Sequence, residues 1–193
     1  VKPREAVKHP NWSMGKKISI DSATMMNKVF EVIEAQRIFN IDKNKFKILI
    51  HPNSYVHAIV KFNNGLIKIL AHDTKMTIPI FNSIYNGQDV HLKSKVINFS
   101  VLNNLKLANP DKKKFPVLNF LKKIPKKNSL FETVLITAND ELVTLYLGGK
   151  IKYLNIYEYL LKIINLNEFK KYYNKEPKDI FEIEKVMTEV KDK

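Results

Sequence analysis

The sequence predicts an α+β fold in which a sheet-containing first half is followed by a C-terminal helical bundle. Three observations support this. Runs of β-branched residues concentrate between 46 and 72, apolar residues follow a helical period from Pro116 onward, and the 193 residues with 45% hydrophobic content can bury a core. The order of these patterns favours two structurally different halves rather than one repeated unit.

Composition excludes several classes of protein. The chain has no cysteine, so disulfides and thiolate metal sites are absent, and His, Asp and Glu remain as metal ligands. No apolar run approaches the roughly 18 residues that span a bilayer, and no signal-peptide pattern appears at the start, so we expect no membrane partner. The chain begins with Val1 rather than Met, and we therefore expect a fragment or a processed product.

The formal net charge of +14 raises the alternative of a non-catalytic basic module that binds nucleic acid. However, Arg4 and Arg37 are the only arginines among 33 basic residues, and the lysines are spread along the chain. Arginine is the preferred residue for bidentate contacts to bases and phosphates. We therefore expect no nucleic-acid partner.

The first element expected is a polar, helix-opening stretch at 1–8, because Pro3 suits a first helical turn. The segment 9–17, HPNWSMGKK, has no period and contains Pro and Gly, which predicts a loop. We expect a short extended stretch at 18–21. Asp21 or Ser22 then caps a helix at 22–39.

Helical spacing sorts the side chains of the helix at 22–39 into two faces. Four apolar residues form one stripe, and four polar residues fall on the opposite side. The apolar stripe contains Met26, Val29, Phe30 and Ile33, and the polar face contains Thr24, Asn27, Lys28 and Glu31. We expect the first face to pack and the second to present chemistry.

The middle of the chain predicts strands, and the end predicts helices. Extended runs lie at 46–50, 54–62 and 66–72, and Asn63-Asn64-Gly65 is typical of a hairpin turn. A short helix is expected at 77–85, followed by a linker at 86–111 with one strand near 96–101. Helical periodicity then covers 117–123, 129–147, 153–164 and 178–191.

The helix at 22–39 carries groups that suit a phosphorylated ligand. Ser22, Asn27 and Lys28 place a hydroxyl, an amide and an ammonium near a positive helix end, and Glu31 could hold Mg²⁺ or Mn²⁺. On spacing alone, the favoured explanation of Asn27, Lys28, Glu31 and Glu34 is the solvated side of an amphipathic helix.

The loop at 9–17 carries large apolar side chains that would lose burial unless the loop closes over a ligand. Trp12 and Met14 therefore favour a lid, and Gly15 would allow the backbone to approach an anionic cofactor. His9 is equally explained as a residue that caps the loop. The other four histidines lack the spacing of a metal motif, and the five glycines cannot form a dinucleotide-binding loop.

The stretch 9–35, HPNWSMGKKISIDSATMMNKVFEVIEA, contains the segments HPNW-x-MG and DSATMMNK-x-x-E. Through them the chain closely resembles the 1-deoxy-D-xylulose 5-phosphate reductoisomerases, NADPH-dependent enzymes of the methylerythritol phosphate route to isoprenoids. The similarity continues through LIHPNSYVHAIVKFNNG, DTKMTIPI, FPVL at 115–118 and ITANDELVTLYL at 136–147. It covers about residues 1–165, and FEIEKVMTEVKDK at the end fits only loosely.

The resemblance implies a role for each matching residue. On the lid, His9 would contact substrate, Trp12 and Met14 would cover the site, and Gly15 would lie against NADPH. On the predicted helix, Ser22, Asn27 and Lys28 would bind the substrate phosphate. Glu31 would bind substrate and ligate Mn²⁺ or Mg²⁺. His9 and Glu31 would be the catalytic residues. The implied reaction isomerises the substrate and reduces the resulting aldehyde to 2-C-methyl-D-erythritol 4-phosphate.

The resemblance also implies an organisation. Residues 1–85 would be the latter part of a catalytic α/β domain with a mixed sheet, an active-site lid at 9–17, an active-site helix at 22–39 and strands at 46–72. A linker at 86–111 and a helical domain at 112–193 would follow. The resemblance implies a homodimer that forms through the catalytic-domain sheet. It also implies that the protein is located in a bacterial cytoplasm or a plastid-type organelle.

The sequence departs from the family in two ways. The family's N-terminal dinucleotide-binding domain and its Asp-Ser-Glu metal stretch are not in this sequence, so we expect the chain alone to be inactive, and an inactive remnant is a further alternative. The family's LNAANE motif reads LITAND here, with Ile136 and Thr137 in place of Asn and Ala. Any support that this motif gives the active site is therefore in question.

Overall fold

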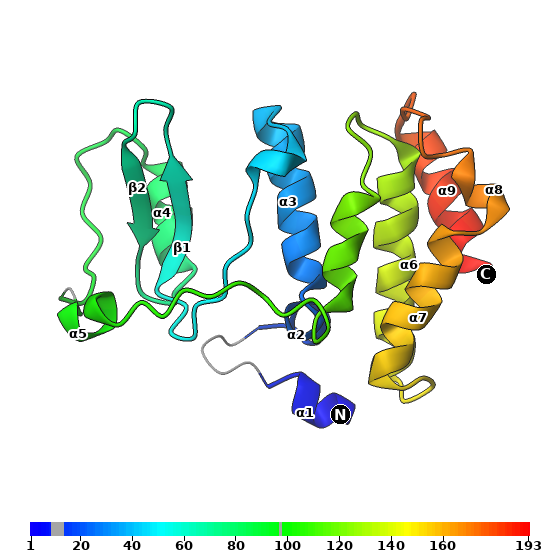
Figure 1. Cartoon of the computed structure of the whole chain (residues 1–193), viewed down its shortest axis with the longest axis horizontal. Coiled ribbons are helices and arrows are strands. Elements are labelled where there is room, and N and C mark those ends of the chain that lie inside the picture. The colour runs from blue at the N-terminus through cyan, green and yellow to red at the C-terminus, as the bar shows by residue number, and fades with distance from the viewer. Residues whose placement is uncertain (9–13, 97) are drawn as a thin grey trace. The chain divides into compact units, whose positions relative to one another are not determined.

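The structure is a computed structural model that describes residues 1–8, 14–96 and 98–193 (Figure 1). Its described residues fall into two compact units. The first contains 1–8, 14–48 and 111–193, and the second contains 49–96 and 98–110. Each unit is described by itself below.

The first unit begins with short helices. α1 spans Pro3–Ala6, α2 spans Lys16–Thr24 and α3 spans Met26–Phe39, followed by a 3-10 turn, η1, at Lys43–Lys45. Met25 alone joins α2 to α3, and its backbone is left-handed with φ 67°. The helix predicted at 22–39 is therefore two helices, and the last two residues of the predicted loop at 9–17 belong to α2.

The extended stretch predicted at 18–21 is wrong, because these residues form the middle of α2. Ile18 and Ile20 favour a strand by intrinsic propensity, but this preference is weak against tertiary packing. Ile20 is fully buried, and Ser19 donates through both its backbone N–H and its hydroxyl to the Gly15 carbonyl. Burial and these bonds favour the helix.

The C-terminal helices follow the predicted pattern closely. A 3-10 helix, η2, spans Pro116–Lys122, and the α-helices are α6 at Leu130–Leu147, α7 at Tyr153–Ile164, α8 at Asn167–Lys170 and α9 at Ile180–Lys191. The short α8 is the one helix of this region that the periodicity did not predict. The Glu132 carboxylate accepts a hydrogen bond of 2.9 Å from the Ser129 N–H and so fixes the start of α6.

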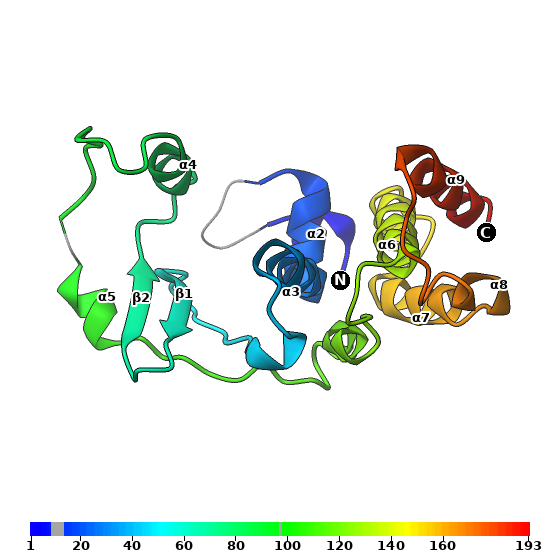
Figure 2. The same cartoon turned by 90° about the horizontal axis from the view of Figure 1, so that it is seen from above.

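The core of the first unit is built around α6. Seen from above, α6 is flanked by α7 and α9, and it also contacts α2 (Figure 2). Val134, Leu135 and Val143 on α6 are fully buried, and Met26 and Val29 from α3 belong to the same cluster. The apolar stripe predicted for α3 therefore packs inward, with Phe30 half-buried at its edge.

The second unit contains a two-stranded antiparallel sheet, β1 at Val56–Lys61 and β2 at Ile67–Ala71, with α4 at Thr77–Ile84 and α5 at Phe99–Asn103. The hairpin turn is where the sequence predicts it, and Gly65 there has φ 87°. The mixed sheet is wrong for this chain, because the described sheet has only these two strands. A parallel pairing needs a further strand, and the described residues provide none.

Two other strand predictions are also wrong. Residues 46–50 contribute only an isolated bridge between Ile50 and Ala108. Near 96–101 the chain starts α5 instead, because the Asn98 side chain accepts a hydrogen bond from the Val101 N–H and caps the helix.

The hairpin has no core of its own. Among the described residues of 49–110 none is buried, and Ile67, Ile69 and Leu70 on β2 are each more than half exposed. An isolated two-stranded hairpin is marginally stable in water.

No helix within the described parts of the chain is both long and apolar enough to cross a membrane.

Candidate functional site

The structure describes six of the eight residues singled out in the sequence. His9 and Trp12 lie outside the described residues. Met14 is half-buried and Gly15 is the N-cap of α2, while Ser22 lies near the end of α2. The other three, Asn27, Lys28 and Glu31, lie on the first two turns of α3.

Three of these side chains converge on the surface of α3. The Asn27 amide donates to one carboxylate oxygen of Glu31 at 2.7 Å. The Lys28 ammonium lies 2.9 and 2.7 Å from the two oxygens of the same carboxylate. An exposed ion pair between residues three apart on a helix contributes little to stability. The cluster therefore offers an amide, an ammonium and a carboxylate to solvent rather than holding the fold together.

The junction between α2 and α3 brings Ser22 close to this cluster in the chain but places it on a different helix. Thr24 stabilises the junction: its hydroxyl donates to the Ile20 carbonyl at 3.0 Å and accepts from the Met26 N–H at 3.3 Å. It thus bonds to the last turn of α2 and to the first residue of α3. A non-glycine residue in the left-handed region, such as Met25, needs this kind of support.

Glu31 can supply one metal ligand but not a complete metal site. Its carboxylate is the hard oxygen donor that Mg²⁺ and Mn²⁺ prefer, and two oxygens leave lone pairs free beside the bonds from Asn27 and Lys28. Within the described ranges, no group of three or more His, Asp and Glu side chains could hold a metal. Any further ligands must come from elsewhere.

Gly15 stands in open space at the start of α2. A Cβ at this position would have no atom within 4 Å, and the residue is exposed. The glycine is therefore not required by protein packing, which leaves its surface accessible to a ligand. The ammonium of Lys17, in the first turn of α2, is paired with the carboxylates of Asp21 and Asp140.

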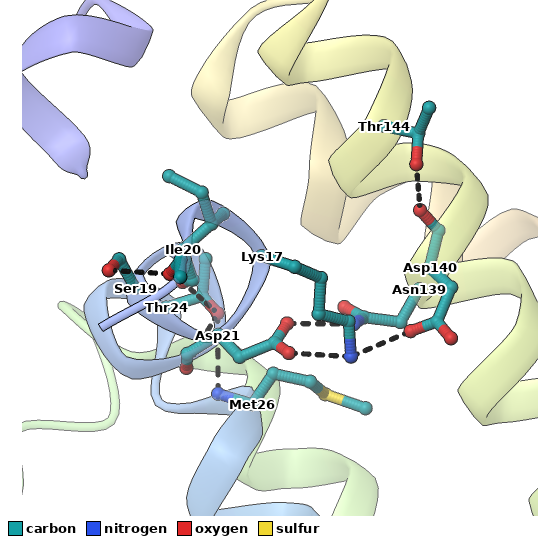
Figure 3. Close-up of polar contacts among 10 residues, drawn as sticks. Lys17, Ser19, Ile20, Asp21, Thr24, Met26, Asn139, Asp140 and Thr144 are labelled. Atoms are coloured by element: carbon teal, nitrogen blue, oxygen red, sulfur yellow. Dashed lines mark hydrogen bonds and ion pairs between the residues drawn. The ribbon is translucent and has the colours of Figure 1, made fainter.

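A polar cluster around the buried Asp21 and Asn139, which the sequence did not predict, lies between α2 and α6 (Figure 3). The carboxylate of Asp21 is 0% exposed. It lies 2.7 Å from the Lys17 ammonium and accepts a hydrogen bond of 2.8 Å from the amide of Asn139. Lys17 also lies 2.7 Å from the carboxylate of Asp140. One ammonium and one amide thus join two helices through two carboxylates.

The electrostatics of this cluster follow from burial and charge. Burial raises the pKa of Asp21 above its ordinary value, and this effect outweighs the opposing bonds from Lys17 and Asn139. Burial alone would lower the pKa of Lys17, but the hydrogen bonds and charges of Asp140 and Asp21 outweigh it and raise the pKa. Lys17 therefore stays charged beside the two carboxylates.

Part of this cluster was visible in the sequence. Lys17 and Asp21 are spaced i, i+4, which would place them together if 16–24 had been recognised as a helix. The partner Asn139 lies 118 residues further along the chain, and nothing in a single sequence connects the two. The LITAND segment does contact α2, through Asn139, which it shares with LNAANE, and through Asp140, which replaces the Glu of that motif.

The fold and the polar site define a helical domain that presents an amide, an ammonium and a carboxylate together near a helix start. Comparison with known proteins makes the assignment specific. The family model for the 1-deoxy-D-xylulose 5-phosphate reductoisomerase C-terminal domain matches residues 1–39, and the DXP reductoisomerase C-terminal domain model matches residues 72–192. The chain therefore belongs to the 1-deoxy-D-xylulose 5-phosphate reductoisomerase C-terminal domain family.

Curated relatives agree. A 1-deoxy-D-xylulose 5-phosphate reductoisomerase of Pelagibacter ubique is 58% identical over 94% of this chain and 47% of its own length. That of Persephonella marina is 39% identical over 89% of this chain and 46% of its own length. The chain thus spans about half the length of the curated relatives it matches.

Solved structures show the same relationship. The reductoisomerase from Zymomonas mobilis in complex with NADPH has a TM-score of 0.83 and 30% identity, over all of this chain and 48% of that one. A DOX-P reductoisomerase in complex with NADPH, fosmidomycin and magnesium has a TM-score of 0.89 and 31% identity, again over all of this chain and 48% of that one.

Replacing Thr24 tests the junction. We expect Thr24→Ala to lower the free energy of unfolding by about 1–2 kcal/mol, because the Met26 N–H loses its acceptor at the start of α3. Thr24→Ser keeps the hydroxyl and should recover most of this loss. Urea unfolding followed by circular dichroism measures both. Equal stabilities for Thr24→Ala and the unsubstituted chain would show that the hydroxyl does not hold the junction.

Proposed function

We propose that this chain supplies the substrate-binding helix, the lid and the C-terminal helical domain of a 1-deoxy-D-xylulose 5-phosphate reductoisomerase. The proposed reaction is the NADPH- and divalent-metal-dependent conversion of 1-deoxy-D-xylulose 5-phosphate to 2-C-methyl-D-erythritol 4-phosphate. The observation that carries the proposal is the convergence of Asn27, Lys28 and Glu31 on one face of α3. Family membership supplies the identity of the ligand.

In this proposal the phosphate binds where α2 and α3 meet. The N-terminal turn of α3 carries the positive end of the helix dipole, which attracts an anion. Ser22 from α2 and Asn27 from α3 donate hydrogen bonds, and the Lys28 ammonium adds a charge-assisted contact. His9, Trp12 and Met14 close the site from the lid and exclude water, and Gly15 lies against NADPH.

Glu31 is proposed to ligate the metal and to touch substrate. A bound Mg²⁺ or Mn²⁺ supplies Lewis-acid polarisation of the substrate oxygens, and NADPH supplies the hydride. The Lys28 and Asn27 side chains orient the Glu31 carboxylate through the bonds that the structure shows. The catalytic residues of this chain are then His9 and Glu31.

The division into a catalytic part at 1–85, a linker at 86–111 and a helical domain at 112–193 remains part of the proposal. So does the homodimer: the exposed apolar side chains of β1 and β2 support a partner chain on the hairpin. The named relatives come from bacteria, which supports a bacterial cytoplasm over a plastid-type organelle as the place of this reaction.

A chimera tests the function. We expect activity when this chain replaces the matching 47% of the Pelagibacter ubique relative, with NADPH consumption that requires both substrate and Mg²⁺ or Mn²⁺. In that chimera Glu31→Gln should lower turnover at least about 100-fold, because changes even to residues behind the metal ligands cost 10–100-fold.

The control for Glu31→Gln is Glu34→Gln, which removes the same charge from an exposed position one turn along α3. Glu34→Gln should leave turnover within about twofold, since surface changes away from special features have small effects. Calorimetry of Mg²⁺ binding supplies a second readout. An inactive chimera would refute the proposed function, and an active Glu31→Gln chimera would refute the metal role.

Lys28 is tested through the Michaelis constant. We expect Lys28→Ala to raise KM for 1-deoxy-D-xylulose 5-phosphate about 10–100-fold, because a hydrogen bond to a charged group contributes 1.5–3 kcal/mol. Lys185→Ala on the exposed face of α9 is the matched charge control and should leave KM unchanged. If the two variants have the same KM, Lys28 does not bind the phosphate.

A further inference from the structure

We propose that Asp21 is a positioning residue: held by Asn139 and Lys17, it fixes the rotation of α2 and thereby aims Ser22 at the substrate phosphate. This inference rests on the proposed function for the identity of the ligand. The link between the helices themselves stands on the geometry of the structure.

The geometry of α2 places the two residues on different sides of the helix. Successive side chains on a helix point about 100° apart. Asp21 is fully buried and bonded to Asn139 of α6, while Ser22 next to it is half-buried. The direction of Ser22 is therefore determined by the direction of Asp21.

Directional contacts between α2 and α6 fix this rotation. α2 has only nine residues, too few to be stable without tertiary contacts. Ile20 supplies apolar burial, but apolar packing is non-directional and tolerates rotation and sliding. Hydrogen bonds are directional, so the bond from Asn139 to Asp21 and the ion pair between Lys17 and Asp140 of α6 select one orientation.

The charge balance argues that the cluster is not there for stability alone. A buried ion pair is weak evidence for stability, because desolvation offsets the attraction between the charges. Removing one partner, however, leaves the remaining charge uncompensated. The Lys17 ammonium serves both Asp21 and Asp140, and Asn139 donates the remaining bond to Asp21. A third carboxylate here would have no matching cation, which suggests the variant to test.

The test compares the single variant Asn139→Asp with the double variant Asp21→Asn/Asn139→Asp, in which the two side chains are swapped. The single variant sets two carboxylates against each other across the α2–α6 contact. The swapped double variant again has one amide and one carboxylate at this contact, but the carboxylate is now on α6. In the chain itself we expect Asn139→Asp to speed amide hydrogen exchange in residues 16–24 about tenfold, which corresponds to about 1.4 kcal/mol. The swapped double variant should restore most of the protection.

In the chimera the same variants are compared by kinetics. We expect Asn139→Asp to raise KM for 1-deoxy-D-xylulose 5-phosphate about tenfold, which is the loss of one charge-assisted hydrogen bond. In a Ser22→Ala background that increase should fall below about threefold, because residues that act through one contact are not additive. A merely structural residue would produce the same increase in both backgrounds.

Leu160→Ala is the control for stability. Leu160 is fully buried on α7 and has no part in the α2–α6 contact, so its truncation weakens the fold without changing KM. Unchanged exchange in 16–24 on Asn139→Asp would overturn the link between the helices. Faster exchange with an unchanged KM, or an equal KM increase with and without Ser22, would overturn the positioning role. If the unsubstituted chimera has no activity, the proposed function and the role of Asp21 in positioning Ser22 are both refuted. Amide hydrogen exchange still tests whether Asp21 and Asn139 hold α2 to α6.

Discussion

The carboxylate of Asp21 has no contact with solvent, and the placement of α2 depends on how its charge is satisfied. A buried charge is tolerated in a protein when it is paired and hydrogen-bonded. Here the pair comes from the same helix, through Lys17, and the hydrogen bond comes from α6, through Asn139. Because α6 contributes many residues to the core of its unit, this bond ties α2 to that core.

The two helices at the proposed site have different tasks. α2 is short and is held from the side by α6, whereas α3 carries its own apolar stripe into the core and leaves Asn27, Lys28 and Glu31 in solvent. Met25 alone separates them, and the Thr24 hydroxyl joins the end of α2 to the start of α3. Two lysines show the same division: Lys17 pairs with the buried Asp21 and with Asp140 of α6, and Lys28 pairs with the exposed Glu31 of its own helix.

Much of the fold followed from periodicity, because a packed helix must place apolar residues on one face. This holds for α7, whose bounds match the prediction, and for the buried stripe of α3. The failures have tertiary causes. Residues 18–21 are predicted as extended because Ile18 and Ile20 favour strands locally, whereas the burial of Ile20 and the bonds of Ser19 to Gly15 favour the helix. The left-handed Met25 carries no glycine signal, and the Asn139 contact crosses 118 residues. The roles of the site residues, including His9 and Trp12, remain predictions.

The most direct measurement of the central claim is a double-mutant cycle in this chain between Asp21→Ala and Asn139→Ala, followed by urea unfolding. If the two side chains hold α2 to α6 together, the cycle should give a coupling free energy of about 1–3 kcal/mol, as groups in one buried network do. Stability losses that add to within about 0.5 kcal/mol would show that the two residues act independently, and would contradict the account.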